Sequence, residues 1–169
     1  VDLPLLADTW VHAGTPDTNY DGYAALVLFT TGLDNALLSF DRSALPTNAT
    51  ILDADLTVFV TFESGATGKR LTALNVENFD PTSVTFADHP TYFNPGPDQF
   101  LPPEPGEMHL TVADQVTNWD QLPVPTLDGK PLGQLALAVS GPYAGRVALA
   151  SLESWPPGRH ARLRVTYLP

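Results

Sequence analysis

The feature that most constrains this chain is a strict alternation of apolar and polar residues. The run ARLRVTY at 161–167 alternates without a break, and the same pattern recurs between Leu52 and Phe62. Successive side chains of a β-strand point to opposite faces of the sheet, so a period of two predicts strands with one packed face and one wet face. We therefore predict an all-β protein.

Ten segments carry this pattern, separated by clusters of Gly, Pro, Asn and Asp. Short strands at such spacing are typical of an antiparallel β-sandwich, here jelly-roll-like, with about ten strands and one short helix. The predicted strands are 7–12, 24–30, 36–41, 52–62, 70–77, 83–87, 107–112, 134–140, 145–151 and 161–167.

The segment 52–62 gives the clearest strand prediction. Its apolar face consists of Ala54, Leu56, Val58, Val60 and Phe62. The polar face contains one aromatic residue, Phe59, which is either a second-layer core residue or an exposed docking point.

One short helix interrupts the strands. Val112, Val116 and Trp119 are spaced as on one helix face, and Thr111 with Asp114 is predicted to form a capping pair. We expect Trp119 to point inward and close one end of the sandwich, and the alternative is a sugar-stacking tryptophan.

The stretch 90–105 is rich in proline, which lacks the donor that helices and central strands need, so we predict no regular structure there. Long loops of this kind are disordered or functional, and Tyr92, Phe93 and Phe100 argue against disorder.

Composition excludes several classes of partner. The net charge is −11, from 19 acidic against 8 basic residues, so nucleic acid would be repelled, as would a polyanionic glycan unless cations bridge it. No apolar run approaches the roughly 18 residues of a membrane helix, so membrane insertion is not expected. The length suits one domain, which we place at 7–169 after an N-terminal arm at 1–6.

Residues 17–22 match the first half of a calcium-binding loop, in which alternate oxygens converge on the cation. The twelfth position of that loop should be a bidentate Glu, and here it is Leu28. The alternative is a turn in which side-chain oxygens cap their own backbone. The predicted calcium ligands are Asp17, Asn19 and Asp21, completed by Asp34 or Asp8.

Catalytic signatures are missing. There is no cysteine, no nucleophile elbow and no paired-histidine zinc motif, and the four histidines stand singly in different segments, so an enzyme is not expected. The sequon at 48–50 marks Asn48 as an acceptor for N-glycosylation if the source glycosylates.

The order of the segments resembles the secreted β-sandwich modules of the DNRLRE domain family, akin to carbohydrate-binding module family 96. The resemblance runs nearly end to end and implies an extracellular, non-catalytic module. The segments that carry it are ADTWV at 7–11, TNYDG at 18–22, ALLSFDRSALP at 36–46, ATILDADL at 49–56, FDPTSVTF at 79–86 and RLRVTY at 162–167.

Two functions remain. The first is a structural or adhesive subunit of a cell-surface or filamentous assembly, whose apolar leader, with Leu3, Leu5 and Leu6, adds a strand to another copy or to another surface protein. These leucines alternatively cover the domain's own edge. We rank this function first, because sugar-binding modules are normally tethered to an enzyme.

The second function is a carbohydrate-binding module for a neutral or calcium-bridged polysaccharide, which is what the resemblance to family 96 implies. Aromatic rings in loops stack well on sugar faces. The predicted ligand-binding residues are Tyr92, Tyr143 and Trp155.

Overall fold

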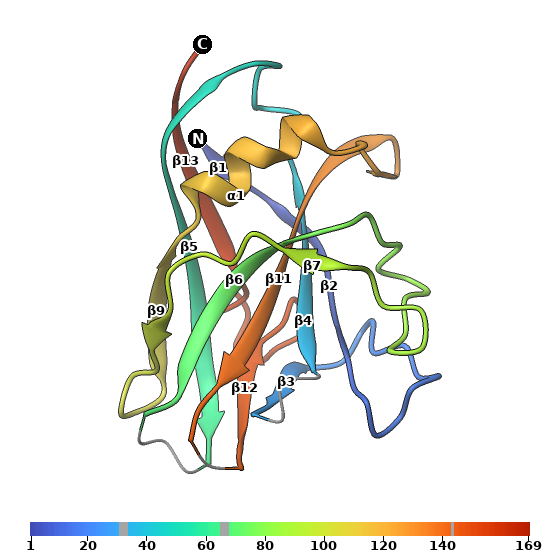
Figure 1. Cartoon of the computed structure of the whole chain (residues 1–169), viewed down its shortest axis with the longest axis vertical. Coiled ribbons are helices and arrows are strands. Elements are labelled where there is room, and N and C mark those ends of the chain that lie inside the picture. The colour runs from blue at the N-terminus through green and yellow to red at the C-terminus, as the bar shows by residue number, and fades with distance from the viewer. Residues whose placement is uncertain (31–33, 65–67, 143) are drawn as a thin grey trace.

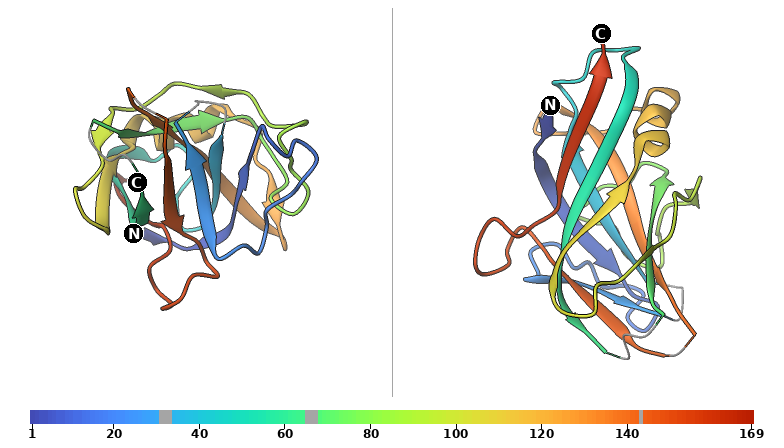
Figure 2. Two further views of the ribbon diagram at one scale, coloured as in Figure 1. Left: turned by 90° about the horizontal axis from the view of Figure 1, so that it is seen from below. Right: turned by 90° about the vertical axis from the view of Figure 1, so that its left-hand side faces the viewer.

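The computed structural model describes residues 1–30, 34–64, 68–142 and 144–169. Two antiparallel sheets face each other with the apolar core between them (Figures 1 and 2). The prediction of an all-β sandwich with a short helix is confirmed.

The first sheet has the strand order β1-β13-β5-β12-β3, and β9 pairs with the other edge of β5. Because β13 and β12 lie end to end along one edge of β5, the loop that joins them leaves the sheet between them. The strands are β1 Asp2–Leu3, β3 Ala25–Phe29, β5 Thr50–Glu63, β9 Gly106–Thr111, β12 Arg146–Ala150 and β13 Arg162–Leu168.

The second sheet has the order β2-β4-β11-β6-β7, with β8 also on β6 and β10 on β11. All seven residues of β4 are buried, whereas β13 alternates between buried and exposed. The second sheet is therefore covered on both faces. Its strands are β2 Leu5–Val11, β4 Asn35–Asp41, β6 Arg70–Val76, β7 Tyr92–Phe93, β8 Gln99–Phe100, β10 Thr126–Leu127 and β11 Lys130–Ser140.

The loop between β6 and β7 provides that cover. Phe79 and Val84 from this loop join Val11, Leu37 and other buried residues in an apolar cluster on the outer face of the second sheet. Gln134 of β11 fixes the loop, because its side chain donates to the Phe79 carbonyl (2.9 Å) and accepts from the Phe79 amide (3.2 Å). Among the described strands, β13 of the first sheet shows the clearest alternation of buried and exposed side chains.

Nine of the ten predicted strands are present, and the prediction at 83–87 is wrong. Val84 is buried in the cluster described above, which explains the apolar signal. The Thr85 amide donates to the Asp88 side chain (2.6 Å) and not to a neighbouring strand. The segment is a loop with one anchoring residue.

The prediction of no regular structure at 90–105 is wrong at two places, because β7 and β8 each pair with β6. Both pairings are two residues long, and the prolines stand outside them. A proline-rich segment can therefore still add short edge strands where no proline needs to donate.

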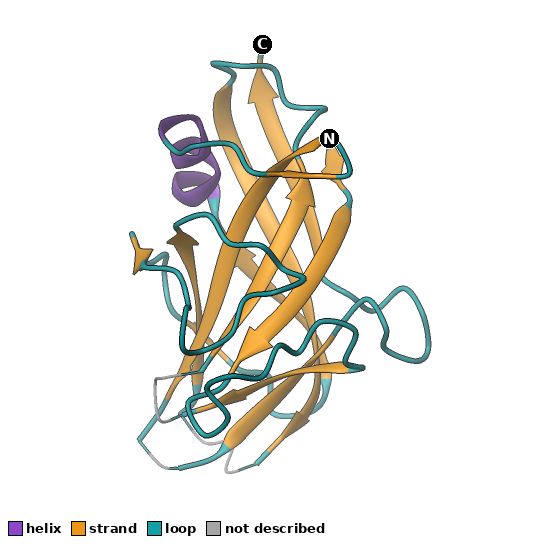
Figure 3. Cartoon of the chain, turned by 90° about the vertical axis from the view of Figure 1, so that its right-hand side faces the viewer, coloured by secondary structure: helices purple, strands orange, loops and turns teal. Residues whose placement is uncertain are grey.

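The helical segment of the described residues consists of α1, Ala113–Thr117, and the 3₁₀ turn η1, Asn118–Gln121 (Figure 3). Trp119 is buried as predicted, and its Nε1 donates to the Gln134 carbonyl at 3.0 Å, which excludes it as an exposed sugar-stacking ring. The prediction that Thr111 and Asp114 form a capping pair is wrong, because Val112 occupies the N-cap position and no side chain caps the helix.

One aromatic residue of β5, Phe62, lies differently from the prediction. The register shifts so that Ala148 faces Phe62 while Leu149 faces Val60, and this irregularity turns Phe62 outward beneath the Arg146 guanidinium (5.0 Å). Phe59 is half-buried on the outer face of the first sheet. The prediction that Phe62 belongs to the core was wrong.

The N-terminal segment folds back onto its own domain. Asp2 pairs with Arg164 and Leu3 with Leu163, so β1 extends the first sheet next to β13. Leu3 is 2% exposed and Leu5 is buried in the same core, while Leu6 is half-buried. These leucines therefore cover the edge of their own domain, which is the alternative stated above. The prediction of a free assembly arm was wrong.

Leu3→Ala is expected to destabilise the protein by about 2–3 kcal/mol, because it empties a buried site that the neighbouring strands cannot refill. Urea unfolding measures the change, and Val1→Ala, which shortens an exposed side chain, is the control. If Leu3→Ala unfolds like the wild type but associates less with other copies, the N-terminal segment acts as an assembly arm after all.

Candidate functional site

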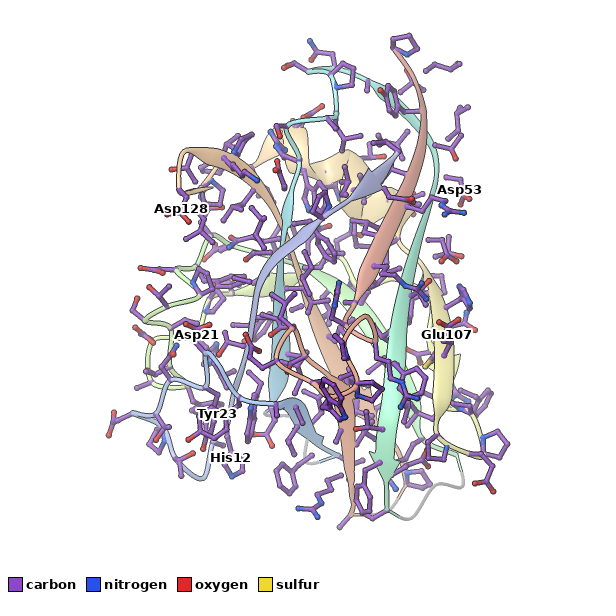
Figure 4. All side chains as sticks on the ribbon, turned by 180° about the vertical axis from the view of Figure 1, so that it is seen from behind. His12, Asp21, Tyr23, Asp53, Glu107 and Asp128 are labelled. Carbon is purple, nitrogen blue, oxygen red and sulfur yellow. The ribbon has the colours of Figure 1, made fainter. Side chains whose placement is uncertain are left out.

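The outer face of the first sheet contains a groove of about 630 Å³ between β1, β13 and β5. We call this the polar groove. The labels Asp53 and Glu107 in Figure 4 mark β5 and β9, and β9 contributes His109 to the polar groove. The polar groove is lined by Asp2, Asp55, Thr57, His109, His160, Arg162 and Arg164 over a floor that includes Leu3, Leu5, Ala161 and Leu163.

Strand pairing brings these polar side chains together. Arg162 lies opposite Thr57, and Thr57 lies opposite His109, while Arg164 lies opposite Asp55. Directly paired residues of antiparallel strands project from the same face. The alternating polar positions of three strands therefore become one continuous surface.

Two ion pairs and one hydrogen bond hold this surface in place. Arg164 Nε lies 2.8 Å from Asp2 Oδ1, Arg162 lies 2.5 Å from Glu107 Oε1, and His109 Nδ1 lies 2.9 Å from Asp55 Oδ1. The hydrogen bond from Arg164 lowers the pKa of the Asp2 carboxyl. Such exposed pairs contribute little to stability. They present an ordered set of hydrogen-bond donors and acceptors to solvent.

The loop between β12 and β13 stands beside the polar groove and projects from the sandwich (Figure 2, right). Its His160 lines the groove, and its Arg159 guanidinium lies 4.6 Å from the Phe59 ring centre. Trp155 of the same loop is 89% exposed. Of the predicted ligand-binding residues, Trp155 is placed where a ligand can reach its ring.

The other two predicted ligand-binding residues are not placed with it. The Tyr92 ring packs against the cluster under the β6–β7 loop and stacks on His89, 5.5 Å between ring centres. Its hydroxyl is buried without a hydrogen-bond partner, and burial raises the pKa of this phenol. Tyr143 lies outside the described residues.

Asn19 and Asp34, two residues of the predicted calcium site, have other partners. Asn19 Nδ2 donates to the carbonyls of Pro81 (3.2 Å) and Val84 (2.7 Å), and its Oδ1 accepts from the Asp21 amide (3.0 Å). Asp34 is buried and accepts from the Ala13 amide (3.1 Å). Among the residues placed in the structure, no three His, Asp or Glu side chains are gathered to hold a metal ion. Calcium binding stays a prediction.

Asn48 is exposed in the turn before β5, with φ of 65°. The turn presents this side chain to solvent. Its glycosylation stays a prediction.

A buried carboxyl group, Asp8 of β2, lies beneath the loop that carries Trp155. Its Oδ2 accepts from the Leu152 amide at 2.9 Å, and its Oδ1 has no hydrogen-bond partner. Burial, with smaller contributions from Glu153 and Asp21, raises the pKa of Asp8 to about 7 despite the Leu152 bond. Sequence reasoning treated Asp8 only as a calcium ligand, because nothing in the chain shows which strand residues another loop will cover.

The fold is a two-sheet antiparallel β-sandwich with a polar groove on the open face of its first sheet. The family model of carbohydrate-binding module family 96 matches residues 1–120, and the chain therefore belongs to this family. No curated protein matches the chain. Modules of such families are typically non-catalytic. The matched part includes β1, β5 and β9, whereas Trp155 and the arginines of β13 follow it.

No helix in the described ranges is long and apolar enough to cross a lipid bilayer.

Proposed function

We propose that this chain binds a polysaccharide along the polar groove, outside the cell, as a non-catalytic module. Membership of carbohydrate-binding module family 96 supports the ligand class. The observation that carries the proposal is the groove itself, because strand pairing gathers two arginines, one histidine and two carboxylates on one open face, and the β12–β13 loop adds His160.

The chemistry of the groove suits sugar hydroxyls. A hydroxyl donates and accepts, so it can bridge an arginine and a carboxylate without leaving either group unpaired. The Thr57 hydroxyl already donates to Asp55 Oδ1 at 3.1 Å, and a hydroxyl of the ligand can donate to a carboxylate in the same manner. The exposed Trp155 ring beside the groove adds a stacking surface.

Charge favours an uncharged glycan or one bridged by calcium. The net charge is −11, and Arg162 and Arg164 are each neutralised by a carboxylate of the protein. A polyanionic chain would have to displace those carboxylates against the field of the whole molecule.

The assembly function, ranked first from the sequence, has no supporting observation. Leu3 and Leu5 fill the core of their own domain, so the segment proposed to join another copy is already used.

A glycan array tests the proposed function. We expect the protein to bind at least one uncharged polysaccharide, and arms with calcium and with a chelator show whether the cation contributes. Arg162→Ala should weaken binding about tenfold, the loss of roughly 1.4 kcal/mol, because its side chain borders the groove. Arg70→Ala is the matched control, since Arg70 is also exposed and ion-paired (3.6 Å to Asp98) but belongs to the second sheet. Absence of binding to every glycan would end the proposal.

A further inference from the structure

A second exposed aromatic ring, Tyr23, accompanies Trp155. Tyr23 is 53% exposed at the end of the connection between β2 and β3, and it is labelled in Figure 4. Exposing the apolar ring of tyrosine or tryptophan to water is energetically unfavourable. Both side chains combine a flat apolar face with a polar edge. Two such rings on adjoining loops offer a larger stacking surface than one.

Hydrogen bonds join the two loops at these residues. Ser151 Oγ donates to the Tyr23 carbonyl at 2.7 Å, and Ser154 Oγ donates to the Ala24 carbonyl at 2.6 Å. Ser154 directly precedes Trp155, so each ring begins within one residue of a bond between the loops. The Ser151 amide also donates to Ser154 Oγ at 2.7 Å, which fixes the turn that carries Trp155.

The Tyr23 ring is supported from behind. It meets the Tyr20 ring edge-on at 5.0 Å between centres, and Tyr20 stacks on the buried Trp10 at 3.9 Å. A ring held by its neighbours loses little conformational entropy when a ligand covers it. The orientation of the Tyr23 ring is therefore fixed before a ligand binds.

The Trp155 ring and the polar groove are within reach of one oligosaccharide. Trp155 lies five residues before His160, which lines the groove, so their backbones are at most about 18 Å apart.

We propose that Tyr23 and Trp155 form an aromatic subsite for the sugar rings of the same chain whose hydroxyls occupy the polar groove. This inference rests on the proposed function and names the sugars that fit it. The subsite takes pyranose rings whose hydroxyls are all or mostly equatorial, such as β-1,4-linked glucose or xylose units, or mannose units with their single axial hydroxyl, because the faces of such rings present mainly C–H groups to an aromatic ring.

The test uses titrations of the full chain with hexasaccharides of β-1,4-linked glucose, mannose and xylose. Trp155→Ala is expected to weaken the best of the three about tenfold, and Tyr23→Ala about fivefold. Tyr23→Phe keeps the ring and should bind like the wild type. Phe100→Ala is the matched control, because Phe100 is a 63% exposed ring on β8 of the second sheet. Thermal unfolding verifies that each variant is folded.

Fluorescence gives a second readout of the same complex. Trp10 and Trp119 are buried, so quenching of the protein by iodide reports mainly on Trp155. The hexasaccharide should protect this emission from iodide in the wild type, and the protected component should vanish in Trp155→Ala.

The outcomes separate the subsite from the proposed function. Weaker binding in Arg162→Ala with unchanged affinity in Tyr23→Ala would refute the subsite and leave the function intact. Equal losses in Tyr23→Ala and Phe100→Ala, or no hexasaccharide binding while another glycan binds, would also refute it. If no glycan binds at all, the proposed function fails, and the subsite fails with it.

Discussion

Gly133→Ala is expected to destabilise the protein by about 3–5 kcal/mol. A Cβ at Gly133 of β11 would lie 2.3 Å from Trp119 Cζ3 and 2.4 Å from Trp119 Cε3. The indole ring is rigid and buried, and its Nε1 donates to the carbonyl of the next residue, Gln134. The ring must leave its site to admit one methyl group, so the change costs about as much as losing the tryptophan.

Urea unfolding of Gly133→Ala measures this loss. Gly106→Ala is the control, because a Cβ there meets nothing closer than the Glu104 carbonyl at 3.9 Å, and we expect it to be neutral or slightly stabilising. Trp119→Ala should be about as unstable as Gly133→Ala. If Gly133→Ala unfolds like the control, the close packing of Trp119 on β11 is incorrect.

The wild-type protein is expected to lose up to about 4 kcal/mol of stability between about pH 4 and about pH 7 through Asp8 alone. The folded protein keeps the Asp8 proton up to about pH 7, whereas an ordinary aspartic acid releases it near 3.8. Between these values the folded state binds more protons than the unfolded state, so raising the pH weakens the fold. The penalty is fully present above about pH 7.

Asp8→Asn isolates this contribution, since the amide oxygen can still accept from the Leu152 amide and carries no charge. Unfolding free energies of the variant should vary less with pH across this window, with the largest gain over the wild type above pH 7. Asp17→Asn, at an exposed position, is the control. If the unfolding free energies of Asp8→Asn and the wild type change with pH in parallel, folding does not raise the pKa of Asp8 and the prediction is wrong.

Four other carboxyl groups act at lower pH and do not mask this effect. Hydrogen bonds from Arg164, Ser43, Thr82 and Thr85 lower the pKa values of Asp2, Asp41, Asp80 and Asp88, respectively. A carboxyl group with a lowered pKa stabilises the fold when the pH is above its ordinary pKa. This stabilisation is lost as the pH falls below that value. Their contribution is therefore constant across the window in which Asp8 titrates.

The sequence predicted the strands that are half-exposed better than the segments that cover them. β5 and β13 alternate because one face meets water, and that alternation is visible in the chain. The segment around Val84 shows the same local signal, yet its backbone bonds to Asp88 and not to a strand. The local pattern of apolar and polar residues indicates which side chains are buried. It does not indicate which backbone groups form hydrogen bonds with a neighbouring strand.

The candidate site was predictable only in part. Trp155 stands between a serine and two prolines, a setting typical of an exposed turn, and the ring is exposed. Tyr92 stands in a similar proline-rich setting and is covered, because β7 pairs with β6 and places the ring over an apolar cluster. Exposure of a loop ring depends on contacts with residues far away in the chain.

The amino-acid sequence by itself determined the fold class, the inward-pointing Trp119 and the resemblance to carbohydrate-binding module family 96, because periodicity and local motifs are properties of neighbouring residues. The tertiary structure alone decided that the N-terminal leucines fill their own core and that the polar groove forms on the first sheet. It also placed Asp8 beneath the Trp155 loop. These features depend on strand order and register, which join residues far apart in the chain, such as Asp2 and Arg164, 162 positions apart.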